Sequence, residues 1–222
     1  PNQPVTDHEK AIEAMMSAAE LMVKIADGSN ITLDPDLDTY YLLASLTSHF
    51  PGVLEHLTSI TNAARVDQGK SVMTADDIVD YAIEQSHYGV HTESIENNAK
   101  AAVAGTQDAK LEGELGTAMS TALPLWQDYQ KEAEVMRKAF ADPDTRRAFD
   151  LAKLADLERR SVAATDAVAQ VMFDESDRLL QIRIDGTMSA LYYKLAFAGF
   201  MTFLSLGLMP VSYTHLTLPT KR

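Results

Sequence analysis

Residues 146–185 of the chain read "RRAFDLAKLADLERRSVAATDAVAQVMFDESDRLLQIRID" and contain neither glycine nor proline. Mostly apolar or small residues recur here at spacings of three and four, the period of one face of an α-helix. This stripe consists of Leu154, Ser161, Thr165, Val168, Met172, Glu175, Leu179 and Ile182. An uninterrupted helix of about forty residues favours a coiled-coil-like element or a stalk over a helix of a compact globular domain.

Helical periodicity also fills the chain before this stretch. The pattern predicts helices near residues 7–27, 34–69, 74–105 and 117–141, with a break or kink at Pro51, a kink at Pro124 and a turn at residues 142–147. Thr74 and Asp77 have the spacing of a capping box, and Gly113 and Gly116 leave room for a bend or a break. No alternation typical of a strand occurs before residue 211. We therefore expect an all-α fold, an elongated antiparallel helical bundle whose long last helix continues into a transmembrane segment.

The sequence "DPDLD" at residues 34–38 predicts the start of a helix. In this interpretation Asp34 is the N-cap, Pro35 is the first helical residue, and Asp36 and Asp38 lie in the first turn, where the helix dipole favours anions. A calcium-binding EF-hand loop is the alternative, but Thr39 and Ser45 occupy the positions that need glycine and glutamate. Helix capping is the better explanation of these aspartates.

Composition excludes several classes of function. The chain has 222 residues, 46% of them hydrophobic, and a formal net charge of −13. Nucleic-acid binding is not expected, because it depends on phosphate neutralisation by Lys and Arg. The absence of cysteine excludes disulfides, thiolate metal sites and cysteine nucleophiles. Because none of the common catalytic or nucleotide-binding motifs occurs, no catalytic residue and no cofactor are predicted.

Residues 191–209 form an apolar run that has one charged residue, Lys194. Tyr192 and Tyr193 stand beside this lysine at the start of the run, where aromatic and long cationic residues are typical of a lipid–water boundary. About 20 apolar residues suffice to span a bilayer. The pattern predicts a transmembrane helix at residues 191–210, with a buried core helix as the alternative.

The last residues, 211–222, break the preceding pattern. Their sequence "VSYTHLTLPT" resembles the translation of a transposase-based sequencing adapter read through in one frame. We therefore expect these residues to be non-native and the gene to be cut at about Pro210. A short genuine strand is the alternative.

Two sets of side chains are candidate binding residues. Glu84, His87 and His91 have the spacing of metal ligands on one helix, although a di-iron bundle needs two such motifs, and a solvated pair of histidines is the simpler explanation. Arginines could contact a carboxylate or phosphate ligand, unless they are ordinary surface residues. The arginine candidates are Arg65, Arg146 and Arg147, followed by Arg159 and Arg160.

Residues 24–57, "KIADGSNITLDPDLDTYYLLASLTSHFPGVLEHL", resemble the extracytoplasmic part of bacterial transmembrane signalling proteins. These are the methyl-accepting chemotaxis proteins and the membrane-bound sensor histidine kinases. Residues 171–200 resemble the last sensor helix of such proteins as it enters the second membrane span. Thr32 and Thr39 depart from the family, which has an apolar and a small polar residue there. The resemblance of residues 24–57 rests on Asp27, Ser29, Asn30, Leu33, Asp34, Pro35, Asp36, Leu37, Asp38, Tyr40, Tyr41, Leu42 and Pro51.

The resemblance implies a sensor domain at residues 1–190 that is periplasmic or extracellular and is anchored in the bacterial inner membrane. It implies a first membrane span before residue 1 and a kinase or methyl-accepting output module after the cut. The fragment itself is then no enzyme, and the activity of the full-length protein depends on that output module. Expected partners are a second copy in a homodimer, the membrane, and a small-molecule ligand or a periplasmic binding protein. A metal-binding bundle with Glu84, His87 and His91 is the alternative function, and a membrane-anchored scaffold is a third.

Overall fold

The computed structural model describes residues 36–106 and 108–216, together with residues 10, 13–14, 17–18, 20–25 and 28; side chains are described as far as residue 206. Within these residues every regular element is a helix and none is a strand, which confirms the predicted all-α class. The helix expected near residues 7–27 lies largely outside the described residues, although residues 20–25 are helical. The elements are α2 (Leu37–Ala44), η2 (a π-helix, Ser45–His49), α3 (Phe50–Asp67), α4 (Ala75–Gly105), α5 (Ala109–Phe140), α6 (Pro143–Ala148) and α7 (Leu151–Leu216).

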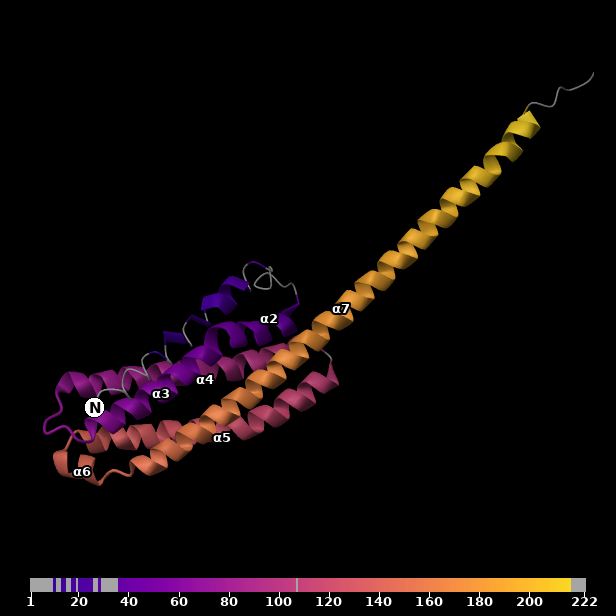
Figure 1. The fold of residues 1–222 in the computed structure, drawn as a ribbon. Coiled ribbons are helices and arrows are strands. Elements are labelled where there is room, and N and C mark those ends of the chain that lie inside the picture. The colour runs from indigo at the N-terminus through magenta and orange to yellow at the C-terminus, as the bar shows by residue number, and fades with distance from the viewer. Residues whose placement is uncertain are drawn as a thin grey trace, which may run out of the picture. The chain divides into compact units, whose positions relative to one another are not determined.

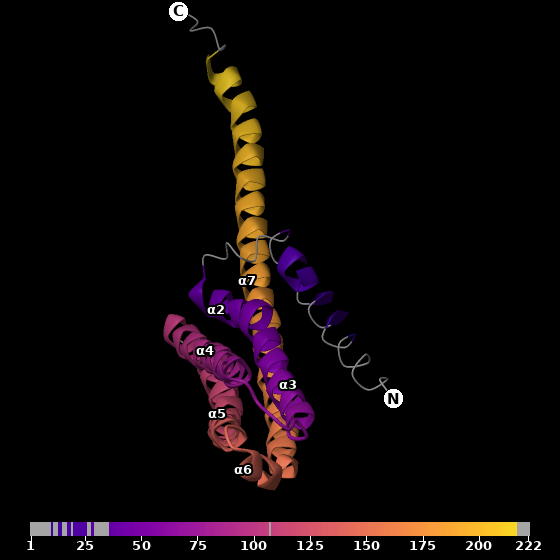
Figure 2. The same cartoon turned by 90° about the vertical axis from the view of Figure 1, so that its left-hand side faces the viewer.

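The chain divides into two compact units, Pro1–Ser176 and Asp177–Arg222. In the first unit, α3, α4, α5 and the N-terminal part of α7 lie side by side, and α6 connects α5 to α7 (Figures 1 and 2). Helix α4 contacts α2, α3 and α5. It therefore joins the helices that precede it in the chain to α5.

Helix α4 begins with the predicted capping box. The backbone N–H of Asp77 donates to Thr74 Oγ1 across 3.1 Å, and the backbone N–H of Thr74 donates to Asp77 Oδ2 across 2.7 Å. These two bonds satisfy donors that have no partner inside the helix. The predicted stripe is also the buried face of α4: Tyr81, Gln85, Tyr88, Thr92, Ile95, Ala99 and Ala102.

The segment before α4 is helical from Leu37 to Asp67, and where a break or kink was expected at Pro51 the helix has a π-helical turn, η2, directly before it. Pro51 lies in the first turn of α3, directly after the π-helix. A proline ring needs room against the preceding turn, and the wider π-helical turn is a common local adjustment. The N-cap of α2 is Asp36, which was expected inside the first turn, while Asp38 lies in that turn and is buried. Asp34 and Pro35 lie outside the described residues.

Helix α5 has no break before residue 117, although the sequence left room there for a bend or a break. It begins at Ala109, where Asp108 Oδ1 accepts from the N–H groups of Lys110 and Leu111, and it continues through Pro124. Gly113 and Gly116 each cost about 1 kcal/mol of helix propensity. Burial of neighbouring apolar side chains such as Leu111 and Leu115 outweighs this cost.

Helix α7 begins at Leu151, where Asp150 Oδ1 accepts from the N–H groups of Ala152 and Lys153. It confirms the long last helix, but it runs past Pro210 and ends at Leu216. The turn expected at residues 142–147 is instead the short helix α6, capped by Asp142. Of the stripe residues in the second unit, Leu179 is buried and Ile182 is exposed.

Candidate functional site

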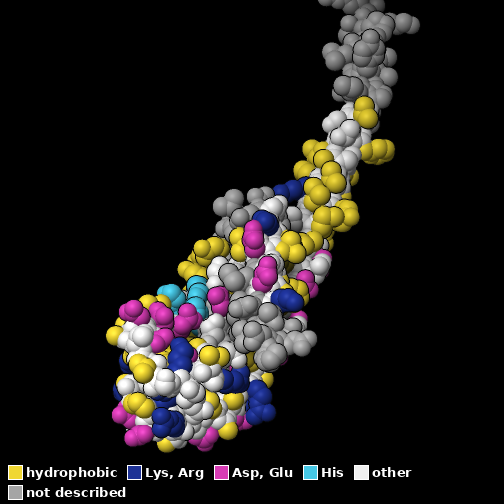
Figure 3. Space-filling model, turned by 60° about the vertical axis from the view of Figure 1, so that its left-hand side comes forward, with side chains coloured by type: hydrophobic (Ala, Val, Ile, Leu, Met, Phe, Trp, Pro, Cys, Tyr) yellow, Lys and Arg dark blue, Asp and Glu magenta, His cyan; other side chains and the backbone are white. Residues whose placement is uncertain are grey.

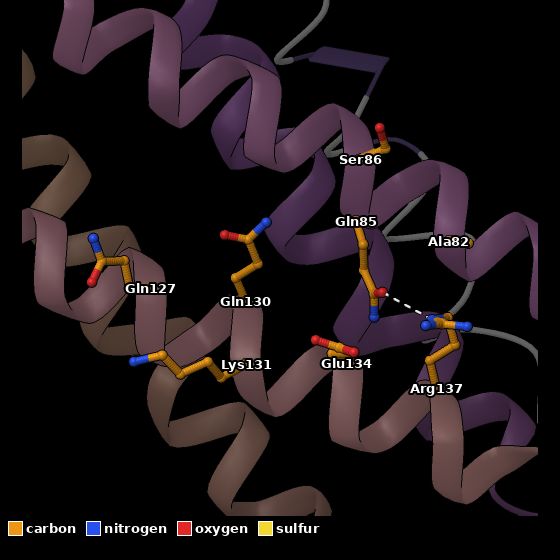
Figure 4. A pocket seen from close by; sticks show the side chains of 8 residues that line it. All are labelled: Ala82, Gln85, Ser86, Gln127, Gln130, Lys131, Glu134 and Arg137. Carbon is orange, nitrogen blue, oxygen red and sulfur yellow. Dashed lines mark hydrogen bonds between the residues drawn. The ribbon is translucent and has the colours of Figure 1, made fainter.

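A polar groove lies between α4 and α5 and has a volume of about 450 Å3 (Figure 4). Helix α4 contributes mostly small residues to it, and α5 contributes long polar ones. Small side chains on one helix opposite long polar side chains on the next leave a space that the apolar core does not fill. The lining residues are Ala82, Gln85, Ser86, Gln127, Gln130, Lys131, Glu134 and Arg137.

Gln85 is the most informative residue of this groove. Its side-chain oxygen accepts a hydrogen bond from Arg137 Nε across 3.2 Å (Figure 4). Its Nε2 is buried and has no hydrogen-bond partner among the described residues. A buried amide nitrogen without a partner costs about 1–3 kcal/mol of folding free energy. Such a group is uncommon in natural proteins, and binding of a ligand to it is one explanation of its presence.

Two charged side chains of the groove, Lys131 and Glu134, already pair with neighbours on α5. Glu134 pairs with Lys138 across 2.7 Å, and this bond holds the pKa of Glu134 below its ordinary value. Lys131 lies 3.3 Å from Asp128. The groove therefore presents Arg137 and the Gln85 amide as donors that suit an oxygen-bearing polar ligand.

The three arginines expected to contact a ligand do not meet in one place. Arg146 is fully buried, and its guanidinium donates to the carbonyl oxygens of Phe140, Lys70 and Ser71 at 3.2, 2.7 and 3.3 Å. It joins the loop before α4 to the end of α5, so its role in the structure is architectural. Arg65 donates to Glu158 across 3.0 Å.

The remaining arginines lie at the surface. Arg147 is exposed, 3.8 Å from Asp144. Arg159 and Arg160 both pair with Asp156 on their own helix. The arginine that lines the groove is Arg137, which sequence reasoning did not single out.

Four histidines from three elements form a second cluster, here called the histidine patch: His49 of η2, His56 of α3, and His87 and His91 of α4. The ring of His91 lies 5.6 Å from the rings of both His49 and His56, and the ring of His87 lies 5.2 Å from that of His56. Figure 3 shows histidine side chains gathered at the surface beside acidic ones. The patch is thus accessible on at least one side.

The three metal candidates of the sequence, Glu84, His87 and His91, are divided within this patch. Glu84 Oε2 lies 2.8 Å from Nδ1 of His56, on α3, and so pairs with a histidine of another helix. His87 contacts the ring of His56, and His91 contacts His49 and His56. Among the described residues no three His, Cys, Asp or Glu side chains already form a group that could hold a metal ion.

Burial affects the titration of two histidines of the patch. It lowers the pKa of His49, and it lowers the pKa of His91 with a smaller contribution from the neighbouring His49, His56 and His87. In both rings burial thus favours the neutral form over the charged one. Sequence reasoning missed His49 and His56 because they lie in another helical segment, 42 and 35 residues before His91.

Polar contacts also join α7 to its neighbours in the first unit. The indole Nε1 of Trp126 donates to Thr165 Oγ1 across 2.9 Å, and Lys110 pairs with the buried Glu175 across 2.7 Å. Lys153 pairs with Glu132. The buried face of α7 thus carries specific polar contacts in addition to apolar packing.

The apolar run of the second unit lies on α7. In the part of the chain that the structure describes, one helix is long and apolar enough to cross a membrane, and it lies within Leu151–Leu206. No part of its most apolar stretch is buried. Leu195, Phe197, Phe200 and Phe203 are exposed by 60–76% of their surface. An exposed apolar surface of this kind marks a membrane or protein contact.

Comparison with models of protein families, with curated proteins and with solved structures finds no match.

Proposed function

We propose that the chain is the sensing part of a membrane-bound bacterial signalling receptor, either a chemoreceptor or a sensor kinase. Residues 1–190 are the extracytoplasmic sensor and residues 191–210 cross the inner membrane. The observation that carries the proposal is helix α7, which has buried residues up to Leu179 and exposed apolar residues from Leu191. A helix with one part in a folded unit and another suited to lipid can carry a displacement from water into the bilayer.

The sensor would be an elongated antiparallel helical bundle. Contacts between α4 and α5 support this arrangement, because residue numbers rise on one helix as they fall on the other. Tyr88 donates to the carbonyl of Trp126, and Gln85 accepts from Arg137, which lies further along α5. Ligands of bundles commonly bind between facing helices.

The groove between α4 and α5 is the proposed ligand site. Arg137 and the Gln85 amide offer donors to a small polar ligand, and a ligand acceptor would satisfy Gln85 Nε2. A ligand that binds there changes the packing of α5, which is bonded to α7 through Trp126 and Thr165. The displaced α7 would then alter an output module beyond the membrane.

Genomic DNA read past the Pro210 codon tests the proposal. A kinase or methyl-accepting module in the same reading frame is the expected result. A stop codon shortly after the apolar run would leave no output module and would overturn the receptor function.

A further inference from the structure

We propose that His49 and His91 form a binding site for a divalent transition-metal ion such as Zn2+, Ni2+ or Cu2+, with water completing the coordination. Imidazole nitrogen is a preferred ligand of these ions. The proposal does not depend on the receptor function, because it concerns a different face of α4 from the groove lined by Gln85 and Arg137.

The separation of the two ring nitrogens fits one metal ion. Nδ1 of His49 and Nδ1 of His91 lie 3.3 Å apart. Two nitrogens bound to tetrahedral zinc at about 2.0–2.1 Å lie roughly 3.3–3.4 Å from each other. Without metal, one Nδ1 donates its hydrogen to the other. Binding moves that hydrogen to the Nε2 of the same ring, a change of tautomer that needs no net loss of a proton.

Gly52 of α3 makes space for the ring of His91. A Cβ added at Gly52 would lie 2.5 Å from His91 Nε2 and 2.6 Å from its Cδ2, far inside van der Waals contact. Any other residue at this position would displace the imidazole. The backbone of α3 thus holds one face of the site open for the His91 ring.

His56 and Glu84 position the pair. The ring of His56 stacks on that of His91 with an interplanar angle of 21°, and the Glu84 carboxylate lies 2.8 Å from Nδ1 of His56. The carboxylate fixes the orientation of the His56 ring, and the stacked His56 ring in turn limits how that of His91 can turn. His56 is here a positioning residue rather than a ligand, because its Nδ1 is bonded to Glu84.

The test uses the untagged full chain in detergent micelles, with ZnCl2 titrated by isothermal calorimetry and imidazole nitrogen shifts followed by NMR. We expect one Zn2+ per chain and shifted Nδ1 resonances of His49 and His91. Loss of an outer-shell partner alone costs about 10–100-fold in metal affinity, so His49→Gln and His91→Gln should each lose at least about tenfold. His87→Gln is the matched control from the same patch and should keep the affinity, because the ring of His87 contacts that of His56 and neither of the two ligand rings.

A backbone variant keeps the test valid if a histidine variant misfolds. Gly52→Ala retains every imidazole but crowds His91, and it should lose affinity. Gly69→Ala, whose added Cβ would meet its nearest atom at 3.9 Å, should not. Absence of Zn2+ binding, or binding that His49→Gln and His91→Gln leave unchanged, would overturn the proposal. Neither result bears on the output module, so failure here and failure of the receptor function are distinguishable.

Discussion

Trp126 and Thr165 form a buried hydrogen bond between α5 and α7, in which the indole Nε1 donates to Thr165 Oγ1 across 2.9 Å. Thr165 Oγ1 in turn donates to the carbonyl of Ser161 across 2.7 Å. Beside this pair, Ser161 Oγ donates to the carbonyl of Leu125 across 3.2 Å. Because these bonds are directional, they fix the register of α7 against α5 more specifically than apolar packing would.

Thr165→Val should destabilise the protein by about 1–3 kcal/mol, because it leaves the Trp126 N–H buried without an acceptor. The free energy of unfolding from urea denaturation measures this loss. The double variant Trp126→Phe with Thr165→Val should cost less than the sum of the two single changes, since both partners are then removed. Additive losses would show that the bond contributes no coupling.

Arg146→Met should destabilise the protein by at least about 1.5–3 kcal/mol, because hydrogen bonds from its charged guanidinium to buried carbonyls are lost. Urea denaturation again gives the change. Arg147→Met is the matched control, and its exposed side chain should matter by no more than about 0.5 kcal/mol. Equal effects of the two variants would contradict an architectural role for Arg146.

Asp77 should make the protein sensitive to acid. Its pKa is lowered, first by the backbone N–H of Thr74 and then by the Thr74 hydroxyl. A carboxyl whose pKa is lower in the folded state than in the unfolded state binds fewer protons when folded. Its contribution is therefore present above its ordinary pKa of about 4 and is lost as the pH falls through the lowered value.

Thermal unfolding of the wild type and of Asp77→Asn across this acid range tests that contribution. The stability difference between the two proteins should be largest at neutral pH and should shrink as the pH falls below about 4. A difference that stays constant with pH would mean that the charge of Asp77 has no part in the cap.

Gln85→Leu should leave stability unchanged or raise it, by up to about 1–3 kcal/mol, because it removes the buried amide nitrogen that has no partner in the described residues. This gain would be offset in part by the lost bond to Arg137. Gln130→Leu, at an exposed position of the same groove, is the control. A loss greater than about 1 kcal/mol for Gln85→Leu would show that the amide serves the fold rather than a ligand.

Local features of the fold were predictable from the sequence. The capping box of Thr74 and Asp77, the buried face of α4 and the long last helix each follow from spacing within one helix. No helix break occurs at Gly113 or Gly116, where tertiary packing outweighs local propensity, and the break or kink expected at Pro51 is a π-helical turn directly before it.

The candidate sites depend on contacts between distant segments, which spacing does not report. His49 and His91 come together only when η2 lies against α4, so a search of one helix found His87 and His91 but missed His49. Arg146 was a candidate ligand contact, with a surface arginine as the alternative, because its carbonyl partners at Lys70 and Ser71 are more than seventy residues away. Small residues at Ala82 and Ser86 were the available sign of a groove on α4.

Membrane insertion of the apolar run tests the central claim most directly. The chain would be synthesised in the presence of phospholipid liposomes and extracted with alkaline carbonate, together with Phe200→Arg and the control Phe173→Arg; the two phenylalanines are 60% and 59% exposed. An arginine at the centre of a spanning helix costs about 2.5–3.5 kcal/mol. The wild type and Phe173→Arg should remain with the liposomes, and Phe200→Arg should be released more readily. Complete release of the wild-type chain by carbonate would contradict a membrane-spanning receptor.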